Sequence, residues 1–315
     1  MIKGIVLALG ACFIWGLIFV VPQLMAGFSS LEVALGRHFC YGSISFFLFL
    51  KHKYFKGLSF PLKIWRKALW FALITNIIYY TFLVLSIRYA TAAVCALIVG
   101  ISPICITFWA NFKQKELSYK SLLLPSLFIL LGLVFVNLPH FNFSTTHSAS
   151  SYFFGLLSAI IALVSWSWYV VNNAQFLKEN PEIQSNEWST LLGVATLFWV
   201  VVVSLTLGLF LAHEEQLQKY VVYSEQLQSF VFGSLVLGLL CSWVGAFFWN
   251  MASLRLPIIL AGQLTIFETI FGVLFVYTFE QRMPSLLEGA GIACMLAATG
   301  WGITLSAKRP LLHAE

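Results

Sequence analysis

The sequence predicts an all-α integral membrane protein with ten transmembrane helices, arranged as two inverted five-helix repeats. Of its 315 residues, 60% are apolar and only 10% are charged, whereas charged residues make up about a quarter of an ordinary soluble domain. The apolar residues gather in runs of about 20, the length that a helix needs to cross a bilayer. This composition excludes the soluble enzyme folds.

Ten apolar runs follow one another along the chain with short polar connections. The predicted spans cover residues 4–24, 31–50, 68–87, 90–112, 120–138, 152–175, 188–211, 229–252, 257–279 and 285–306. Only a tight turn around Arg88 separates the third span from the fourth. The six cysteines lie within these runs and have no CxxC spacing, so we expect small core residues rather than disulfides or metal ligands.

The basic residues predict the orientation of the spans. With the N-terminus inside, fourteen of the 18 basic residues flank the cytoplasmic ends of the spans, and only Arg88, Lys219 and Arg282 lie on the other side. Cytoplasmic loops carry an excess of Lys and Arg in membrane proteins. We therefore expect both termini to be cytoplasmic.

The polar stretch FNFSTTHSASS, at residues 141–151, lies at the midpoint and is predicted to link two halves of five spans each. Because five is odd, two related halves must cross the membrane in opposite orientations, as in many secondary transporters. Internal similarity favours such a repeat, since WGLIFVVPQ in the first span is similar to WSWYVVNNAQ in the sixth. The alternative is that any two apolar helices look alike.

Several segments occur in an order and at spacings typical of one family. They are LGACFIWGLIFV, LEVALGRHF, ALIVGISPICITFWANFKQKELS and FFWNMASLRLPIILAGQLTIFETIFGVLFVYTFEQRMP. Together they resemble the ten-helix EamA-type branch of the drug/metabolite transporter superfamily over essentially the whole chain. The resemblance implies a first repeat at residues 1–140, the linker at 141–151, a second repeat at 152–306 and a cytoplasmic tail at 307–315. It also implies a central substrate cavity near the midplane and transport of small organic metabolites such as amino acids, often outward.

The ninth span departs from the family pattern. Glu268 is followed by Thr269, where the family often has Pro. Without that Pro, we expect the ninth helix to be straighter than in the family.

Glu268 is the sharpest functional candidate, because it lies midway along the ninth span. Residues 256–279 include fourteen Leu, Ile, Val or Phe, each favouring insertion by roughly 0.3 to 0.6 kcal/mol, which outweighs the cost of about 3 kcal/mol for one acid. Ionisable groups within a bilayer usually mark a substrate or proton path. Glu268 is therefore a candidate proton carrier, and the alternative is that it only hydrogen-bonds a neighbouring helix.

Arg37 and His38 lie in the second span and are the other candidates for proton coupling or gating. Arg37 can snorkel or pair with Glu32, five residues earlier, and a structural role is favoured over substrate contact. His38 can titrate near neutral pH, although a membrane His is more often a hydrogen-bonding partner between helices.

Amides and aromatic rings form the second group of candidates, because rings supply apolar area and cation–π attraction while amides fix orientation. The predicted substrate-binding residues are Gln23, Asn76, Tyr79, Tyr80, Trp166, Trp168, Tyr169, Asn172, Trp243, Trp249, Asn250 and Gln263. Aromatic residues also form belts at membrane interfaces, so we expect only about half of this set to line the path.

Two further patterns concern helix geometry and packing. Pro22 and Pro103 lie inside spans and are expected to break or kink them. Small residues recur at a spacing of four, which permits close helix approach within the subunit or in a homodimer. These stripes are Ala92, Ala96 and Gly100 in the fourth span, and Gly289, Ala293 and Ala297 beside Ala290, Cys294, Ala298 and Gly302 in the tenth.

The sequence favours a secondary transporter of a small organic metabolite in a bacterial cytoplasmic membrane, with export of an amino acid or a related amphipathic compound as the first hypothesis. All twelve acids are Glu and no GxxxxGK[ST] motif occurs, which excludes the pump ATPases and favours a gradient as the energy source. We predict no catalytic residue, metal, cofactor or nucleic-acid partner. The expected partners are the substrate and the lipid bilayer, and a homodimer with a second copy of the chain stays open.

Other functions stay open. Within transport, the alternatives are an uptake carrier or exchanger for a cationic metabolite, and a multidrug exporter. From a different class, the chain could be a membrane-embedded enzyme or a non-transporting receptor.

Overall fold

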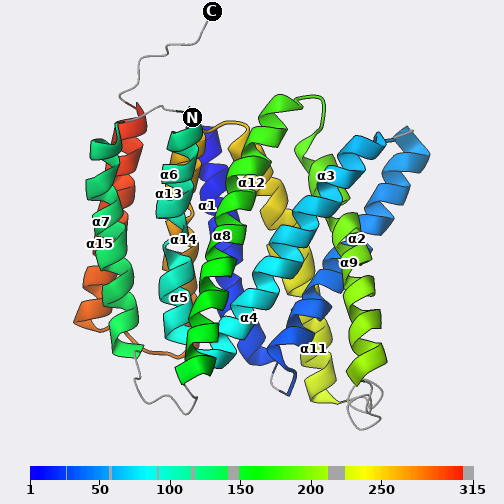
Figure 1. Ribbon diagram of the computed structural model, residues 1–315, viewed down its shortest axis with the longest axis horizontal. Helices are drawn as coiled ribbons and strands as arrows, with labels where there is room; N and C mark the ends of the chain where they lie inside the picture. Colours follow the sequence, from blue (N-terminus) through cyan, green and yellow to red (C-terminus); the bar gives the residue numbers. More distant parts are fainter. Residues whose placement is uncertain are drawn as a thin grey trace, which may run out of the picture.

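The computed structural model describes residues 1–25, 27–56, 59–90, 92–114, 118–140, 149–211 and 224–307, and these residues form helices without any strand. Ten helical segments are long and apolar enough to cross a membrane, which confirms the predicted number of spans (Figure 1). The predicted linker, up to residue 148, and the predicted tail, from residue 308, lie outside the described residues, as does Lys219.

The first half begins with a helix that changes its geometry before it ends. Its elements are α1 (Ile2–Gly16), the 3₁₀ segments η1 (Leu17–Phe19) and η2 (Val21–Leu24), α2 (Ser30–Lys56), α3 (Leu62–Ala72), the π-helical η3 (Leu73–Ile78), α4 (Tyr79–Tyr89), α5 (Ala92–Gly100), α6 (Ser102–Gln114), α7 (Tyr119–Asn137) and the 3₁₀ segment η4 (Leu138–His140). The connection between α4 and α5 is short, as predicted, but it follows Tyr89, and Arg88 lies in the last turn of α4.

The second half has the same number of spans. Its elements are α8 (Ala149–Glu179), α9 (Ser185–Leu211), α11 (Glu225–Val236), the π-helical η5 (Leu237–Val244), α12 (Gly245–Ser253), α13 (Ile258–Leu264), α14 (Ile266–Phe279) and α15 (Leu286–Ala307).

Consecutive spans run in opposite directions, so α1 begins and α15 ends at the same face of the bundle, at the top of Figure 1. We call this the basic face, because most basic residues of the described chain lie at helix ends there; the other end is the opposite face. The basic face carries Lys3, Lys51, Lys53, Lys63, Arg66, Lys67, Lys113, Lys120, Lys178 and Arg255. Its assignment to the cytoplasm stays a prediction.

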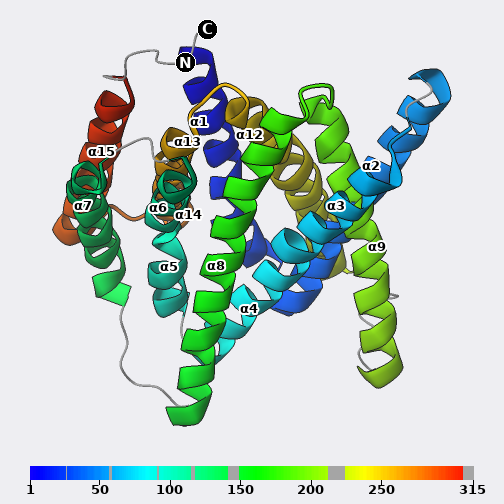
Figure 2. The same ribbon diagram turned by 45° about the horizontal axis from the view of Figure 1, so that its top comes forward.

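Helix pairing is unchanged when the two halves are exchanged. The second span, α2, packs on the seventh, α9; α6 of the fourth packs on α13 of the ninth; and α7 of the fifth packs on α15 of the tenth. The pair formed by α4 and α8 likewise corresponds to the pair formed by α12 and α1. Figures 1 and 2 show α7 and α15 together at one side of the bundle. This pairing supports the predicted inverted repeat, as do the π-helical segments inside both the third and the eighth span.

The expectation of a straighter ninth helix is wrong. The span is interrupted at Thr265, between α13 and α14. The Oγ1 of Thr265 donates to the carbonyl of Gly262 at 2.6 Å, and the backbone N–H of Glu268 bonds to the carbonyl of Thr265 at 3.0 Å. A threonine hydroxyl that takes a nearby carbonyl competes with the regular helix ladder, so Thr265 replaces Pro as the cause of the break.

Both predicted proline breaks are confirmed. Helix α1 gives way to 3₁₀ segments after Gly16, with Pro22 inside η2. The fourth span is interrupted at Ile101, and Pro103 lies in the first turn of α6, where its missing N–H costs least.

Of the two stripes predicted in the tenth helix, the structure buries Ala298 and Gly302 of the second, and Gly302 lies against Gln263 of α13. Gly132 and Gly291 bring α7 and α15 together, since a Cβ at Gly132 would lie 2.7 Å from the Gly291 carbonyl oxygen. Ala293 and Ala297 are exposed, and no atom of the described residues lies within 4 Å of a Cβ built at Gly289. That stripe therefore faces away from the subunit, and the possible homodimer stays a prediction. All six cysteines are free thiols, as predicted.

Candidate functional site

One cavity of about 640 Å³ lies between the two halves. Its walls come from both halves, with lining residues on α1, α2, α4, α8, α12 and α14 among others. The volume is in the range of small-molecule sites. The cavity reaches the connection between α14 and α15, where Glu280 and Arg282 line it, so it opens toward the opposite face.

Toward the basic face, the cavity ends against closely packed rings. Phe71 on α3 and Trp188 on α9 are fully buried. The ring of Phe176, on α8, lies 4.4 Å from that of Trp188 and 6.0 Å from that of Phe71. Lys67 closes this layer with its Nζ 5.0 Å from the centroid of the Phe71 ring. The cavity is thus open at one face and closed at the other.

The deep part of the cavity is lined by touching aromatic rings. The ring of Trp166 lies 5.8 Å from Trp15, 5.4 Å from Tyr79 and 5.8 Å from Tyr169, and Trp15 lies 5.4 Å from Trp249. The indole N–H of Trp15 donates to the carbonyl of Cys241 at 2.7 Å, which fixes that ring. These rings line the cavity, so a molecule bound there would contact aromatic surface.

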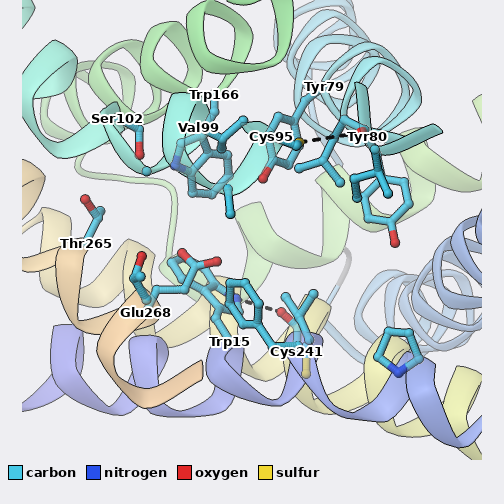
Figure 3. Close-up of a pocket in the computed structure, with 18 of the residues that line it drawn as sticks. Trp15, Tyr79, Tyr80, Cys95, Val99, Ser102, Trp166, Cys241, Thr265 and Glu268 are labelled. Atoms are coloured by element: carbon cyan, nitrogen blue, oxygen red, sulfur yellow. Dashed lines mark hydrogen bonds between the residues drawn. The ribbon is translucent and has the colours of Figure 1, made fainter. Parts of the chain in front are cut away.

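Glu268 points into this ring-lined space. Figure 3 shows its side chain directed between the rings of Trp15 and Trp166, with Ser102 and Thr265 nearby. The interruption of the ninth span just before Glu268 sets the direction of the side chain. Ser102 and Thr265 come from the two interrupted spans and add hydroxyls to the same region.

Arg37 supplies the opposite charge from α2. Its Nε donates to Ser242 Oγ at 2.9 Å, and its guanidinium lies 5.9 Å from the centroid of Tyr80. Arg37 and Glu268 line the same cavity and interact electrostatically across it. The cavity can therefore offer an anionic and a cationic contact to one guest.

The mouth of the cavity carries a second charged cluster. Both terminal nitrogens of Arg282 donate to the buried Glu288, at 3.0 and 3.1 Å, and its Nε donates to Glu280 at 2.6 Å. The guanidinium also lies 4.4 Å from the centroid of the Tyr277 ring. Hydrogen bonds to Glu288 and then Glu280 raise the pKa of Arg282. Two carboxylates around one guanidinium give the mouth a net negative charge.

The structure brings nine of the fifteen predicted site residues to the cavity lining. They are Arg37, His38, Asn76, Tyr79, Tyr80, Trp166, Tyr169, Trp249 and Glu268. His38 is buried and meets Tyr80 edge-on at 5.6 Å. Asn76 donates to Thr196 Oγ1 at 2.7 Å from the π-helical η3. The indole nitrogen of Trp249 is buried and has no hydrogen-bond partner among the described residues.

Three of the other predicted residues lie outside the cavity lining, where they contact other protein groups. Gln23 donates to the carbonyl of Phe19 at 2.9 Å. Trp168 packs edge-on against Phe71 at 5.3 Å. Asn172 accepts from Lys113 Nζ at 3.0 Å.

The remaining three lie between helices. Trp243 donates to Thr190 Oγ1 at 3.2 Å. Gln263 is buried against Gly302 of α15. Asn250 belongs to a buried network with Asn173.

Sequence reasoning missed Trp15, Ser102, Thr265 and Thr269, all of which line the cavity. The signal for Trp15 was present, because the similarity between the first and sixth spans aligns it with Trp166. The hydroxyl residues gave no signal, since Ser and Thr are common in membrane helices. They reach the cavity only because the fourth and ninth spans are interrupted there.

The first half of the chain matches a family of transporters, and the whole chain is similar to an inner membrane protein. Residues 2–138 match the model of the EamA-like transporter family. The inner membrane protein YtfF of Escherichia coli (strain K12) is 29% identical over 320 residues, covering 100% of this chain and 99% of that protein. A crystal structure of a protein with 15% sequence identity has the same fold, with a TM-score of 0.74 over 97% of this chain and 98% of that one.

Proposed function

We propose that the chain is a transporter of the EamA-like family, whose model matches residues 2–138, and that it moves a small organic metabolite across the bacterial inner membrane by alternating access. The match to the EamA-like transporter family supports transport rather than an enzymatic activity. The inner membrane location follows the name of the E. coli relative. The basic face is then the cytoplasmic one, by the excess of Lys and Arg there.

Alternating access is supported by the one-sided cavity. The structure corresponds to a state open to the opposite face, in which the ring layer of Phe71, Phe176 and Trp188 closes the cytoplasmic side. Transport requires a second state in which this layer opens and the mouth near Arg282 closes. A pair of halves with equivalent helix contacts can exchange such arrangements by rocking.

The substrate that this cavity fits best is an amino acid or a related amphipathic compound. The observation that carries this proposal is the placement of Arg37 and Glu268 in one ring-lined cavity. A carboxylate of the guest would bind Arg37, and its ammonium would lie at Glu268 against the faces of Trp15 and Trp166. Cation–π contacts of this kind contribute roughly 0.5 to 2 kcal/mol each, and a charge-assisted hydrogen bond about 1.5 to 3 kcal/mol.

Export is the proposed direction, and a cationic metabolite is the alternative substrate. The acidic mouth formed by Glu280 and Glu288 around Arg282 favours a cation. A cationic guest needs Glu268 and the rings but makes no use of Arg37. The two substrate classes therefore differ in their dependence on one residue.

Exchange in liposomes tests the proposal. Purified protein is reconstituted, loaded with one unlabelled amino acid at a time, and assayed for uptake of its labelled form, after a thermal-shift screen has identified binders. Each amino acid is compared with its decarboxylated amine and its N-acetylated acid, which lack one of the two charges. We expect exchange of the zwitterion only. Exchange of the amine alone would favour the cationic alternative, and no flux of any compound would refute the proposal.

A further inference from the structure

A chain of buried hydrogen bonds lies directly behind the closed end of the cavity. Trp188 Nε1 donates to Asn173 Oδ1 at 2.7 Å, Asn173 Nδ2 donates to Asn250 Oδ1 at 2.8 Å, and Asn250 Nδ2 donates to Ser189 Oγ at 2.9 Å. The hydroxyl of Ser189 then donates to the carbonyl of Ser185 at 2.8 Å. We call Asn173, Trp188, Ser189 and Asn250 the amide network.

The amide network joins three helices near the basic face. Asn173 lies in the last turns of α8, Ser189 in the first turns of α9, and Asn250 near the end of α12. All members of the network are fully buried. Its bonds exist only while these three helix ends stay together, so they lie across the route from the cavity to the basic face.

The network is also coupled to the cavity wall. Trp249, the residue before Asn250, lines the cavity, and so does Tyr41. The hydroxyl of Tyr41 donates to the carbonyl of Ser189 at 2.7 Å. A guest that displaces either ring therefore acts on helices that the network holds.

The polar composition suits a contact that must open and close repeatedly. Separating an apolar contact exposes apolar surface to water, which costs about 25 cal/mol of free energy per Å². Amides that separate form new hydrogen bonds with water, so the net free energy lost with each bond is small. In the closed state, the low local dielectric makes the same bonds directional.

The two halves differ at this point. The similarity that aligns Trp15 with Trp166 places Val21 and Pro22 opposite Asn172 and Asn173. Pro22 has no donor, and it lines the open part of the cavity within the 3₁₀ segment η2. Helix α8, by contrast, continues unbroken to Glu179. The amide pair is thus present at the closed end, and its counterpart at the open end has no amide.

We propose that the amide network is the latch that keeps the cavity closed toward the basic face, with Asn173 and Asn250 as positioning residues for transport. The inference rests on the proposed function, because a latch has meaning only if the closed end opens. Breaking the latch shifts the population toward the state open at the basic face.

Hydrogen exchange in lipid nanodiscs tests the latch without any substrate. Wild-type protein is compared with Asn173→Ala and with the matched control Asn172→Ala, which removes the neighbouring amide outside the network. For Asn173→Ala, we expect exchange to rise about tenfold in residues 170–179, 185–190 and 249–253, the effect of losing about one net hydrogen bond. Because the opposite mouth must close as the basic face opens, exchange in residues 17–24 should fall in the same variant.

The reciprocal change distinguishes a latch from a merely structural contact. Faster exchange near Asn173 with no change in residues 17–24 would mean local loosening and would overturn the proposal, as would an Asn173→Ala profile equal to that of the control. If Asn173→Ala does not fold, Ser189→Ala removes only the last acceptor of the network, and the same two segments decide. Transport is measured separately, in liposomes. If wild-type protein shows no flux but Asn173→Ala shows the reciprocal exchange pattern, the proposed function is refuted and the latch stands.

Discussion

Gly132 on α7 lies so close to α15 that adding one methyl group should measurably destabilise the protein. A Cβ at this position would lie 2.7 Å from the carbonyl oxygen of Gly291 and 2.6 Å from Met295 Cγ, whereas ordinary contacts begin at 3.4 Å. Because the Gly291 oxygen is a backbone atom and cannot rotate away as a side chain can, the two helices must separate by about 0.7 Å, the difference between 2.7 and 3.4 Å. Overpacking of this kind typically costs about 1 to 3 kcal/mol.

The matched control is Gly300→Ala on α15, where the part of the chain that the structure describes has no atom within 4 Å of the added Cβ. Both substitutions gain the same helix propensity, up to about 1 kcal/mol, so this contribution cancels in the comparison. We expect Gly132→Ala to unfold several degrees below Gly300→Ala, and Gly300→Ala to unfold at or above the wild-type temperature. Thermal unfolding in detergent, followed by tryptophan fluorescence, measures the difference. Equal midpoints for the two variants would refute the close packing of α7 on α15.

Three further predictions concern transport and topology. Glu268→Gln should abolish the pH dependence of flux in proteoliposomes, because the variant cannot bind or release a proton; an unchanged pH profile would remove Glu268 from proton coupling. Arg37→Gln should weaken binding of the zwitterionic substrate roughly 10- to 100-fold, the range of one charge-assisted hydrogen bond, while leaving binding of the corresponding amine unaltered in a thermal-shift titration; equal losses for both ligands would contradict a carboxylate contact. Met283 and Tyr54 are 89% and 85% exposed at opposite faces, so a membrane-impermeant maleimide should label Met283→Cys in intact cells and Tyr54→Cys only after permeabilisation; the reverse result would invert the proposed topology.

The position of Glu268 in the cavity was predictable, because a carboxylate in a long apolar span has a high free-energy cost unless it is solvated or paired. It must face a cavity or a polar partner, and the ring-lined cavity is such a place. The same reasoning selected Arg37 and the aromatic residues that line the cavity with Glu268 and Arg37. It failed for residues whose polarity is ordinary, such as Ser102 and Thr265, because a hydroxyl can satisfy itself on its own helix.

The neighbouring amides Asn172 and Asn173 show where sequence reasoning ends. One accepts from Lys113 outside the cavity, and the other lies fully buried in the amide network. Successive helix residues point about 100° apart, so only one of them can face the network. In a helix that is apolar almost all round, no local pattern decides which one it is.

By itself, the sequence determined that the chain crosses a membrane ten times, since a bilayer requires about 20 apolar residues for each crossing and the basic residues flank alternate ends. It also predicted the breaks near Pro22 and Pro103, where a proline removes an N–H from the helix, although Pro125 lies inside the continuous helix α7. Only the tertiary structure decided the rotation of each helix, the meeting of Trp15 with Trp166, and which end of the cavity is closed. These features depend on contacts between residues more than a hundred positions apart, which local hydropathy does not encode.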